Sequence, residues 1–149
     1  MLFVCPGNSC RSVMAEALAR RLAPDIIAAS SAGLTPLGYV CPSTLAVLAE
    51  IGVSGAGQRS KPLVWSEVAA PDLLINMTGR PISHAGKPVE NWRVADPFGH
   101  DLSIYRNTRD EIERRVTELA KRLRAGTAAE CRTPVWASPT ITRSARRNS

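Results

Sequence analysis

Residues 5–12, which read CPGNSCRS, constrain the fold of this chain more than any other segment. The short apolar run at residues 2–4 before them is typical of a buried strand. From Ser12 onward, apolar residues recur at helical spacing among strong helix formers. The octet is therefore predicted to be a strand-to-helix loop with backbone N–H groups converging at a helix N-terminus. That geometry binds a tetrahedral oxyanion and favours the thiolate form of a cysteine.

Two side chains of this loop are candidates for chemistry. Cys5 is the candidate nucleophile, since a thiolate can attack phosphorus; the alternative is a small buried hydrophobic residue at a strand end. Arg11 offers the two-pronged donor that suits phosphate oxygens. A cation in the first turn of a helix opposes the helix dipole, so a bound anion explains Arg11 better than an ordinary surface position. The pattern predicts phosphate binding and covalent chemistry.

The remaining loop residues are expected to complete the phosphate-binding segment. Asn8 tolerates left-handed backbone geometry and is expected to tie the loop to a neighbour, for which Ser31 is the candidate. Ser12 is either a plain N-cap or a hydrogen-bond donor to the Cys5 thiolate, and both roles are compatible. The predicted phosphate-binding set is Pro6, Gly7, Asn8, Ser9, Cys10, Arg11 and Ser12.

Asp96, in an Asp-Pro pair, is the candidate acid that protonates the leaving oxygen. We expect the apolar residues Val94 and Phe98 to desolvate its carboxyl group and to keep part of it protonated. The alternative is a structural aspartate held in a salt bridge. Spacing alone does not separate the two.

The chain alternates predicted strands with predicted helices, which indicates an α/β domain with a parallel sheet. We expect a second strand at residues 26–29 that ends at residues 30–33, then a helix capped by Ser43 and closed by Gly52. Short helical turns at 66–70, a buried strand at 72–77 and a strand near 92–94 follow. The last helix is predicted to begin after Asp101 and to end at Gly126.

The net charge of +6 does not by itself indicate a nucleic-acid partner. Residues 125–149 carry four arginines against one glutamate, so +3 of the +6 lies in this segment. The segment is rich in Thr, Ser, Ala and Pro, which favours a disordered tail over a nucleic-acid-binding arm. We expect one domain over residues 1–124 and a basic tail over 125–149.

Composition also excludes several other classes of protein. No apolar run approaches the length of a membrane span, and the N-terminus lacks the charged flank of a signal peptide. We therefore expect a cytoplasmic protein without a membrane partner. The four cysteines form neither a disulfide framework nor a paired zinc motif, and only two histidines are present. We expect no metal and no other cofactor, and the sequence does not indicate an oligomeric state.

Residues 4–16 (VCPGNSCRSVMAE), together with Asp96-Pro97, resemble bacterial low-molecular-weight protein tyrosine phosphatases. The likeness reaches about Arg124 and includes residues 31–33, 60–63, 72–78 and 96–99. A Cys-x5-Arg-Ser loop alone occurs in other phosphatase folds, but its place at the N-terminus with Asp-Pro far downstream is specific to this family. The resemblance implies a single domain with a four-stranded parallel sheet flanked by helices and a phosphate-binding loop after the first strand. Only four residues precede Cys5, so we expect either a short first strand or a natural start upstream of Met1.

The resemblance also implies a two-step mechanism. Cys5 attacks phosphorus to form a phosphocysteine while Asp96 protonates the leaving group, and the ionised Asp96 then activates the hydrolytic water. Arg11 and the loop N–H groups hold the phosphoryl oxygens, while the family pattern makes Asn8, Ser12 and Ser31 supports of the loop. Cys10 matches the family's second loop cysteine, which can form a protective disulfide with the nucleophile; its alternative role is packing.

Ser9 occupies the loop position that helps to choose the substrate in this family. Tyrosine phosphatases often carry an aliphatic residue there, and the family's protein-arginine phosphatases carry threonine, so the Ser9 hydroxyl is nearer to the second group. The alternative is that Ser9 simply fits a tight loop. We expect a phosphotyrosine-bearing protein as the first substrate, because that activity is commoner, and phosphoarginine as the second.

Two further alternatives are less favoured. The thioredoxin-coupled arsenate reductases of this structural family need two more downstream cysteines, and this chain has none between Cys41 and Cys131. Arsenate reduction is therefore expected only if an external thiol substitutes. A catalytically idle oxyanion-binding module is expected to lose the thiol, the arginine or the acid, and this chain retains all three.

Overall fold

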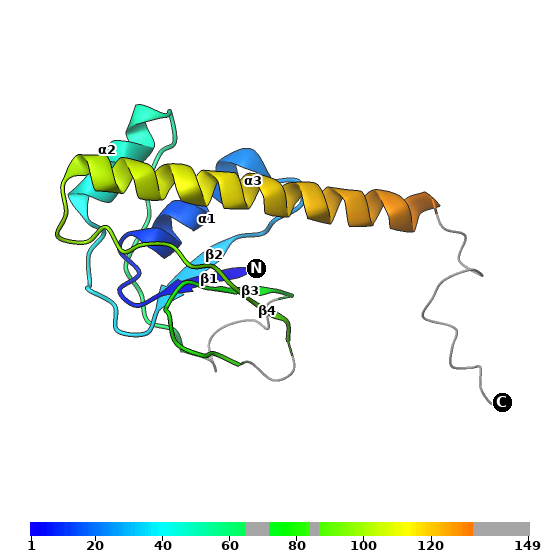
Figure 1. Ribbon diagram of the computed structural model, residues 1–149, viewed down its shortest axis with the longest axis horizontal. Helices are drawn as coiled ribbons and strands as arrows, with labels where there is room; N and C mark the ends of the chain where they lie inside the picture. The colour runs from blue at the N-terminus through cyan, green and yellow to red at the C-terminus, as the bar shows by residue number, and fades with distance from the viewer. Residues whose placement is uncertain (65–71, 84–86, 133–149) are drawn as a thin grey trace.

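The computed structural model describes residues 1–64, 72–83 and 87–132 (Figure 1). The helical turns predicted at residues 66–70 lie outside this part of the chain. Four parallel strands form one sheet in the order β2-β1-β3-β4. They are β1 (Leu2–Cys5), β2 (Ser30–Gly33), β3 (Leu74–Asn76) and β4 (Val89–Asn91). The predicted α/β domain with a four-stranded parallel sheet is confirmed.

Three helices pack against one face of this sheet: α1 (Arg11–Leu22), α2 (Pro42–Glu50) and α3 (Leu102–Arg132) (Figure 1). Alternate residues of β1 point to opposite faces, as strand geometry requires. Phe3 and Cys5 join the large core beneath the helices, whereas Leu2 and Val4 join a smaller cluster on the other face. β1 lies between β2 and β3, so the strand that follows it in the chain pairs on one side of it and the next strand pairs on the other. The loop after β1 therefore lies at the topological switch point of the sheet, where parallel α/β sheets bind their ligands.

Three predicted elements are displaced in the structure. The strand predicted at residues 26–29 is wrong: the backbone turns there, with Ile27 N–H bonded to the Ala23 carbonyl, and β2 begins at Ser30. Burial of Ile27 against the helices, rather than strand pairing, explains the apolar run. The cap of α2 is Cys41 rather than Ser43, since Pro42 takes the first helical position. The last strand, β4, ends just before the predicted position of residues 92–94.

The last helix begins as predicted and ends later than predicted. Asp101 Oδ1 accepts a hydrogen bond from the Ile104 N–H at 3.3 Å, which is the expected N-cap contact. Gly126 does not end the helix, because α3 continues to Arg132. A single glycine costs a helix only about 1 kcal/mol relative to alanine. The predicted tail at 125–149 thus starts inside α3, and residues 133–149 lie outside the described part.

Candidate active site

The loop between β1 and α1 places Cys5 at the carboxyl end of a central strand and Arg11 at the start of a helix. Asn8, in the middle of the loop, has φ +46°, a left-handed conformation that asparagine tolerates better than most residues. Gly33 on the neighbouring strand lies so close that an added Cβ would sit 2.9 Å from the Asn8 backbone nitrogen and from the Pro6 carbonyl oxygen. The loop therefore folds tightly against β2.

Two donors from Ser12 face the sulfur of Cys5, which is almost fully buried. Ser12 Oγ lies 3.0 Å from Cys5 Sγ, and the Ser12 N–H donates to the same sulfur at 3.4 Å. Because Asn8 Nδ2 donates to Ser12 Oγ at 2.7 Å, the Ser12 hydroxyl keeps its own proton for Cys5. Hydrogen bonds to the charged form stabilise a thiolate. Ser12 makes the contact expected of a thiolate donor.

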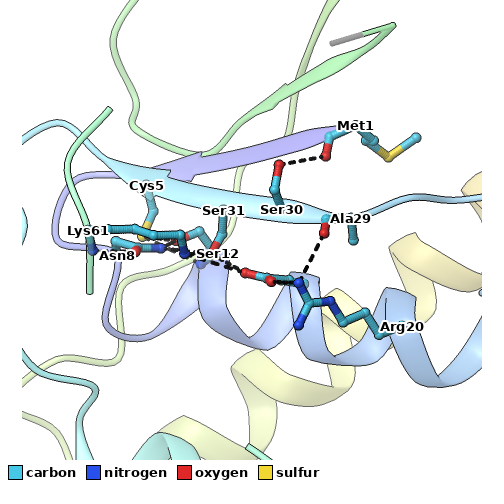
Figure 2. Close-up of polar contacts among 10 residues, drawn as sticks. Met1, Cys5, Asn8, Ser12, Arg20, Ala29, Ser30, Ser31 and Lys61 are labelled. Atoms are coloured by element: carbon cyan, nitrogen blue, oxygen red, sulfur yellow. Dashed lines mark hydrogen bonds and ion pairs between the residues drawn. The ribbon is translucent and has the colours of Figure 1, made fainter. Parts of the chain in front are cut away.

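Asn8 joins the loop to two other segments (Figure 2). Its Nδ2 donates to Ser31 Oγ at 3.0 Å, which is the predicted contact, and its Oδ1 accepts the Lys61 backbone N–H at 2.8 Å. The amide thus uses both donors and its acceptor on fixed partners. A buried polar network in which every member has a partner is rigid.

Glu16, which the sequence patterns did not single out, also belongs to this network. Ser31 Oγ donates to Glu16 Oε1 at 2.5 Å, and Arg20 and Lys61 form ion pairs with the same buried carboxylate. Burial lowers the pKa of Lys61, whose ammonium lies 3.8 Å from Glu16. Glu16 follows Ser12 by four residues on α1, so helical spacing alone places both on one face. That spacing was the signal available in the sequence.

Arg11 is held with part of its guanidinium free for a ligand. Nη1 donates to the carbonyls of Met77 and Val94, both at 3.1 Å, and Nη2 lies 3.6 Å from Asp96 Oδ2. Nε is buried and has no hydrogen-bond partner among the described residues. A buried donor left unpaired costs about 1–3 kcal/mol, so the geometry favours an acceptor at this position.

Asp96 forms an ion pair with Arg11. This is the contact expected under the alternative prediction, in which Asp96 is held in a salt bridge. Phe98 N–H donates to Asp96 Oδ1 at 3.1 Å. The expected desolvation by Val94 and Phe98 is wrong, because the Asp96 side chain is 55% exposed. Val94 packs into the core, and Phe98 is itself 47% exposed, so neither covers the carboxylate.

Cys5, Arg11 and Asp96 meet in one pocket. Asn8 and Ser12 are not among its lining residues; their side chains brace the loop from behind. The pocket is lined by Cys5, Pro6, Gly7, Ser9, Cys10, Arg11, Thr35, Leu37, Asp96 and Phe98.

Ser9 and Cys10 both line the pocket, yet their side chains are engaged elsewhere. The Ser9 hydroxyl donates to the Tyr39 carbonyl at 2.7 Å and accepts the Cys41 N–H at 2.9 Å. Cys10 Sγ lies 3.7 Å from the Tyr105 hydroxyl and also contacts Cys41. Burial raises the pKa of the Cys10 thiol to about 12, so it stays protonated at neutral pH. These contacts match the packing roles left open for both residues.

Within the described residues, no cluster of His, Cys, Asp and Glu side chains could hold a metal ion. The same part of the chain contains no helix that is both long enough and apolar enough to cross a membrane.

Comparison with known proteins places this geometry in a family. The family model described as low molecular weight phosphotyrosine protein phosphatase matches residues 1–129. The chain belongs to this family. It is 33% identical to the probable low molecular weight protein-tyrosine-phosphatase EpsP of Ralstonia nicotianae, over 84% of this chain and 96% of that protein.

Other relatives within the family have different names. The chain is 32% identical to the protein-arginine-phosphatase of Bacillus subtilis, over 83% of this chain and 96% of that protein. It is 33% identical to the glutaredoxin arsenate reductase of Synechocystis sp., over 83% of this chain and 97% of that protein. Among solved structures, the YwlE arginine phosphatase matches with a TM-score of 0.70 at 30% identity, covering 83% of this chain and 94% of that one. Family membership therefore leaves the substrate open.

Proposed function

We propose that this protein is a cysteine-dependent protein phosphatase that hydrolyses phosphotyrosine through a phosphocysteine intermediate. The observation that carries the proposal is that Cys5, Arg11 and Asp96 line one pocket. The unpartnered, buried Nε of Arg11 supports a bound oxyanion in that pocket. The free, buried thiols Cys5, Cys10 and Cys41 also support a reducing, cytoplasmic setting.

In the first step, the Cys5 thiolate attacks phosphorus, so an S–P bond forms while the ester O–P bond breaks. Protonated Asp96 gives its proton to the leaving phenolic oxygen. Ser12 stabilises the thiolate before attack through the 3.0 Å contact of its hydroxyl. The Arg11 guanidinium, held by the carbonyls of Met77 and Val94, binds the phosphoryl oxygens whose charge is spread in the transition state.

In the second step, a water molecule attacks the phosphocysteine from the side that the phenol has left. The Asp96 carboxylate takes a proton from that water, the S–P bond breaks, and inorganic phosphate and the Cys5 thiolate are released. The 55% exposure of Asp96 supports this role, because water reaches the carboxylate without a change in the fold.

The pocket walls favour an aryl phosphate over a phosphorylated guanidinium. Leu37 and Phe98 are partly exposed and line the pocket, which suits the apolar faces of a phenol ring. Asp96 is the only carboxylate among the described lining residues, whereas a guanidinium needs several acceptors. The Ser9 hydroxyl, which favoured phosphoarginine in the sequence analysis, is bonded to Tyr39 and Cys41.

Arsenate reduction is the second candidate, and the relatives named as arsenate reductases support it. Arsenate is a tetrahedral oxyanion like phosphate and suits the same loop. The sequence offers no cysteine between Cys41 and Cys131. The burial of Cys10 and Cys41 further weakens an internal thiol relay, so reduction requires an external thiol.

The test compares three substrates on the same protein, with Cys5→Ser as the blank. Phosphate release is measured from a phosphotyrosine peptide and a phosphoarginine peptide, and arsenite formation from arsenate with glutathione and glutaredoxin. We expect phosphotyrosine to turn over fastest. Faster phosphoarginine or arsenate turnover assigns the enzyme to that substrate instead. No turnover in any arm supports the idle oxyanion-binding module.

A further inference from the structure

A second cleft lies at the carboxyl ends of β3 and β4 and shares no lining residue with the pocket at Cys5. Segments 76–81 and 91–93 supply its lining residues. The two segments lie together because β3 and β4 pair in parallel, with Asn76 beside Asn91. The carboxyl edge of the sheet therefore carries both this cleft and the phosphate loop, and it is the edge where parallel α/β sheets bind ligands.

The buried side chain of Asn76 holds the first segment in a tight turn. Its Oδ1 accepts the Thr78 N–H at 2.9 Å, and its Nδ2 donates to the Arg80 carbonyl at 2.6 Å. Nδ2 also donates to Asn91 Oδ1 at 2.9 Å. Because a carbonyl can only accept, the orientation of both amides is fixed. The NH2 group of Asn91 is thereby left as a donor without an acceptor among the described residues.

Two arginines line the cleft without a partner. The guanidinium groups of Arg80 and Arg93 are exposed, and neither forms a hydrogen bond or ion pair within the described part of the chain. The neighbouring acid is engaged elsewhere, since Glu90 accepts Trp92 Nε1 and pairs with Arg122, both at 2.8 Å. No aspartate or glutamate is among the described lining residues. The unengaged polar groups of the cleft are therefore donors, two of them cationic, and they suit a carboxylate.

The cleft lies close enough to the active-site pocket for one peptide to reach both. The Val94 carbonyl accepts a hydrogen bond from Arg11 at 3.1 Å, and Arg93 is the residue directly before it. Asp96, which lines the active-site pocket, follows Arg93 by three residues. Three extended residues span about 10 Å. A substrate peptide held by its phosphotyrosine therefore brings residues about three positions away to the cleft.

We propose that this cleft binds an acidic side chain of the substrate protein, about three residues from the phosphotyrosine. The proposal rests on the proposed function, because the phosphotyrosine bound at Cys5 is what places the acidic residue. Arg80 and Arg93 pair with its carboxylate, and the Asn91 amide donates to it. The cleft thus adds a preference for acidic sequences to a pocket that contacts the phosphoryl group and the ring.

Two phosphotyrosine peptides test this preference. One carries glutamate three residues from the phosphotyrosine on each side, and the other carries glutamine at both positions. Because exposed ion pairs are individually weak, we expect kcat/KM to favour the glutamate peptide roughly threefold to tenfold, mainly through KM. The Arg80→Gln/Arg93→Gln protein is expected to lose this preference. It is expected to keep its rate on para-nitrophenyl phosphate, which has no carboxylate.

The matched control is Arg21→Gln/Arg124→Gln, which removes the same charge near the far end of α1 and is expected to keep the preference. Four results each overturn the proposal: equal rates on the two peptides in the parent protein, a preference retained without Arg80 and Arg93, an equal loss of preference in the control, or an equal loss on para-nitrophenyl phosphate. Failure of the parent protein to hydrolyse either phosphotyrosine peptide overturns the proposed function instead, and the substrate-binding role of the cleft with it.

Discussion

The two halves of the candidate active site are built differently. On the nucleophile side, Cys5, Asn8 and Ser12 are buried and joined through Ser31 to a buried carboxylate. On the acid side, Asp96 is more than half exposed and is held by one backbone N–H and a 3.6 Å ion pair to Arg11.

This difference indicates where the site is pre-organised and where it adapts. The half that we propose to bind the oxyanion is held by buried hydrogen bonds, so in that proposal it supplies electrostatic stabilisation with little reorganisation. In the proposed mechanism Asp96 serves a leaving group in one step and a water molecule in the next, and an exposed, lightly held carboxylate can reach both. Arg11 touches both halves, because it lines the pocket beside Cys5 and pairs with Asp96.

Arg11→Ala tests the shared residue and is expected to have the largest effect. It removes the donors for the phosphoryl oxygens, and an arginine in this role is worth roughly a thousandfold to a hundred-thousandfold in kcat. Steady-state hydrolysis of an aryl phosphate measures the loss. Arg11→Lys keeps the charge without the planar fork and is expected to recover only a small part of the activity. Retention of more than about a tenth of kcat by Arg11→Ala would contradict the site assignment.

Asp96→Ala tests the adaptable half. General acid catalysis contributes about a hundredfold to ten-thousandfold, and most when the leaving group is poor. We expect a large loss of kcat on phenyl phosphate and a much smaller loss on para-nitrophenyl phosphate. Asp96→Asn, which keeps the size but not the proton transfer, is expected to behave like the alanine variant. Equal losses on the two esters would mean that another group is the acid.

Ser12→Ala tests the pre-organised half. A hydrogen bond to a charged group is worth about 1.5–3 kcal/mol, so its loss is expected to lower the thiolate fraction of Cys5 and to slow turnover roughly tenfold to a hundredfold. The rate at which iodoacetamide alkylates Cys5, followed by peptide mass spectrometry, reports the thiolate directly. Ser31→Ala, which acts one step further from the sulfur, is the matched control with a smaller expected effect. Unchanged alkylation in Ser12→Ala would remove Ser12 from the mechanism.

Cys10→Ala has the smallest expected effect and concerns stability rather than catalysis. Burial raises the pKa of Cys10 from 9.0 to about 12, so between these values the folded protein holds a proton that the unfolded chain has lost. The free energy of unfolding therefore falls as pH rises through that window, by up to about 1.4 kcal/mol per pH unit from this group. Urea unfolding at a series of alkaline pH values measures the slope. We expect the slope to be shallower in Cys10→Ala, and an unchanged slope would contradict the buried-thiol description.

Local sequence patterns predicted the nucleophile side well, because it is built within one short segment. The strand, the loop and the start of α1 are contiguous, and the contacts of Ser12 with Cys5 and Asn8 lie within that segment. The role of Glu16 was missed because its partners Ser31 and Lys61 come from other segments of the chain. The exposure of Asp96 was also mispredicted, since burial depends on how a loop packs rather than on its neighbours in sequence.

The same distinction applies to the fold. Periodicity predicted the α/β class and the buried strand β3, whereas the apolar residues near Ile27 misplaced the second strand. A short apolar run is equally compatible with pairing in a sheet and with packing under helices. The end of the last helix was mispredicted at Gly126 for a different reason: helix-forming residues after a glycine can outweigh the free-energy cost of that single glycine within the helix.

The central claim is that Cys5 carries the phosphoryl group, and trapping the intermediate tests it most directly. Asp96→Ala protein is mixed with para-nitrophenyl phosphate, whose good leaving group needs little help from an acid in the first step, then quenched within milliseconds and digested for mass spectrometry. Without the base for the second step, we expect phosphate attached to the peptide that contains Cys5, on the sulfur and not on Ser12. Turnover without any phosphocysteine, or with phosphate on another residue, would contradict the account.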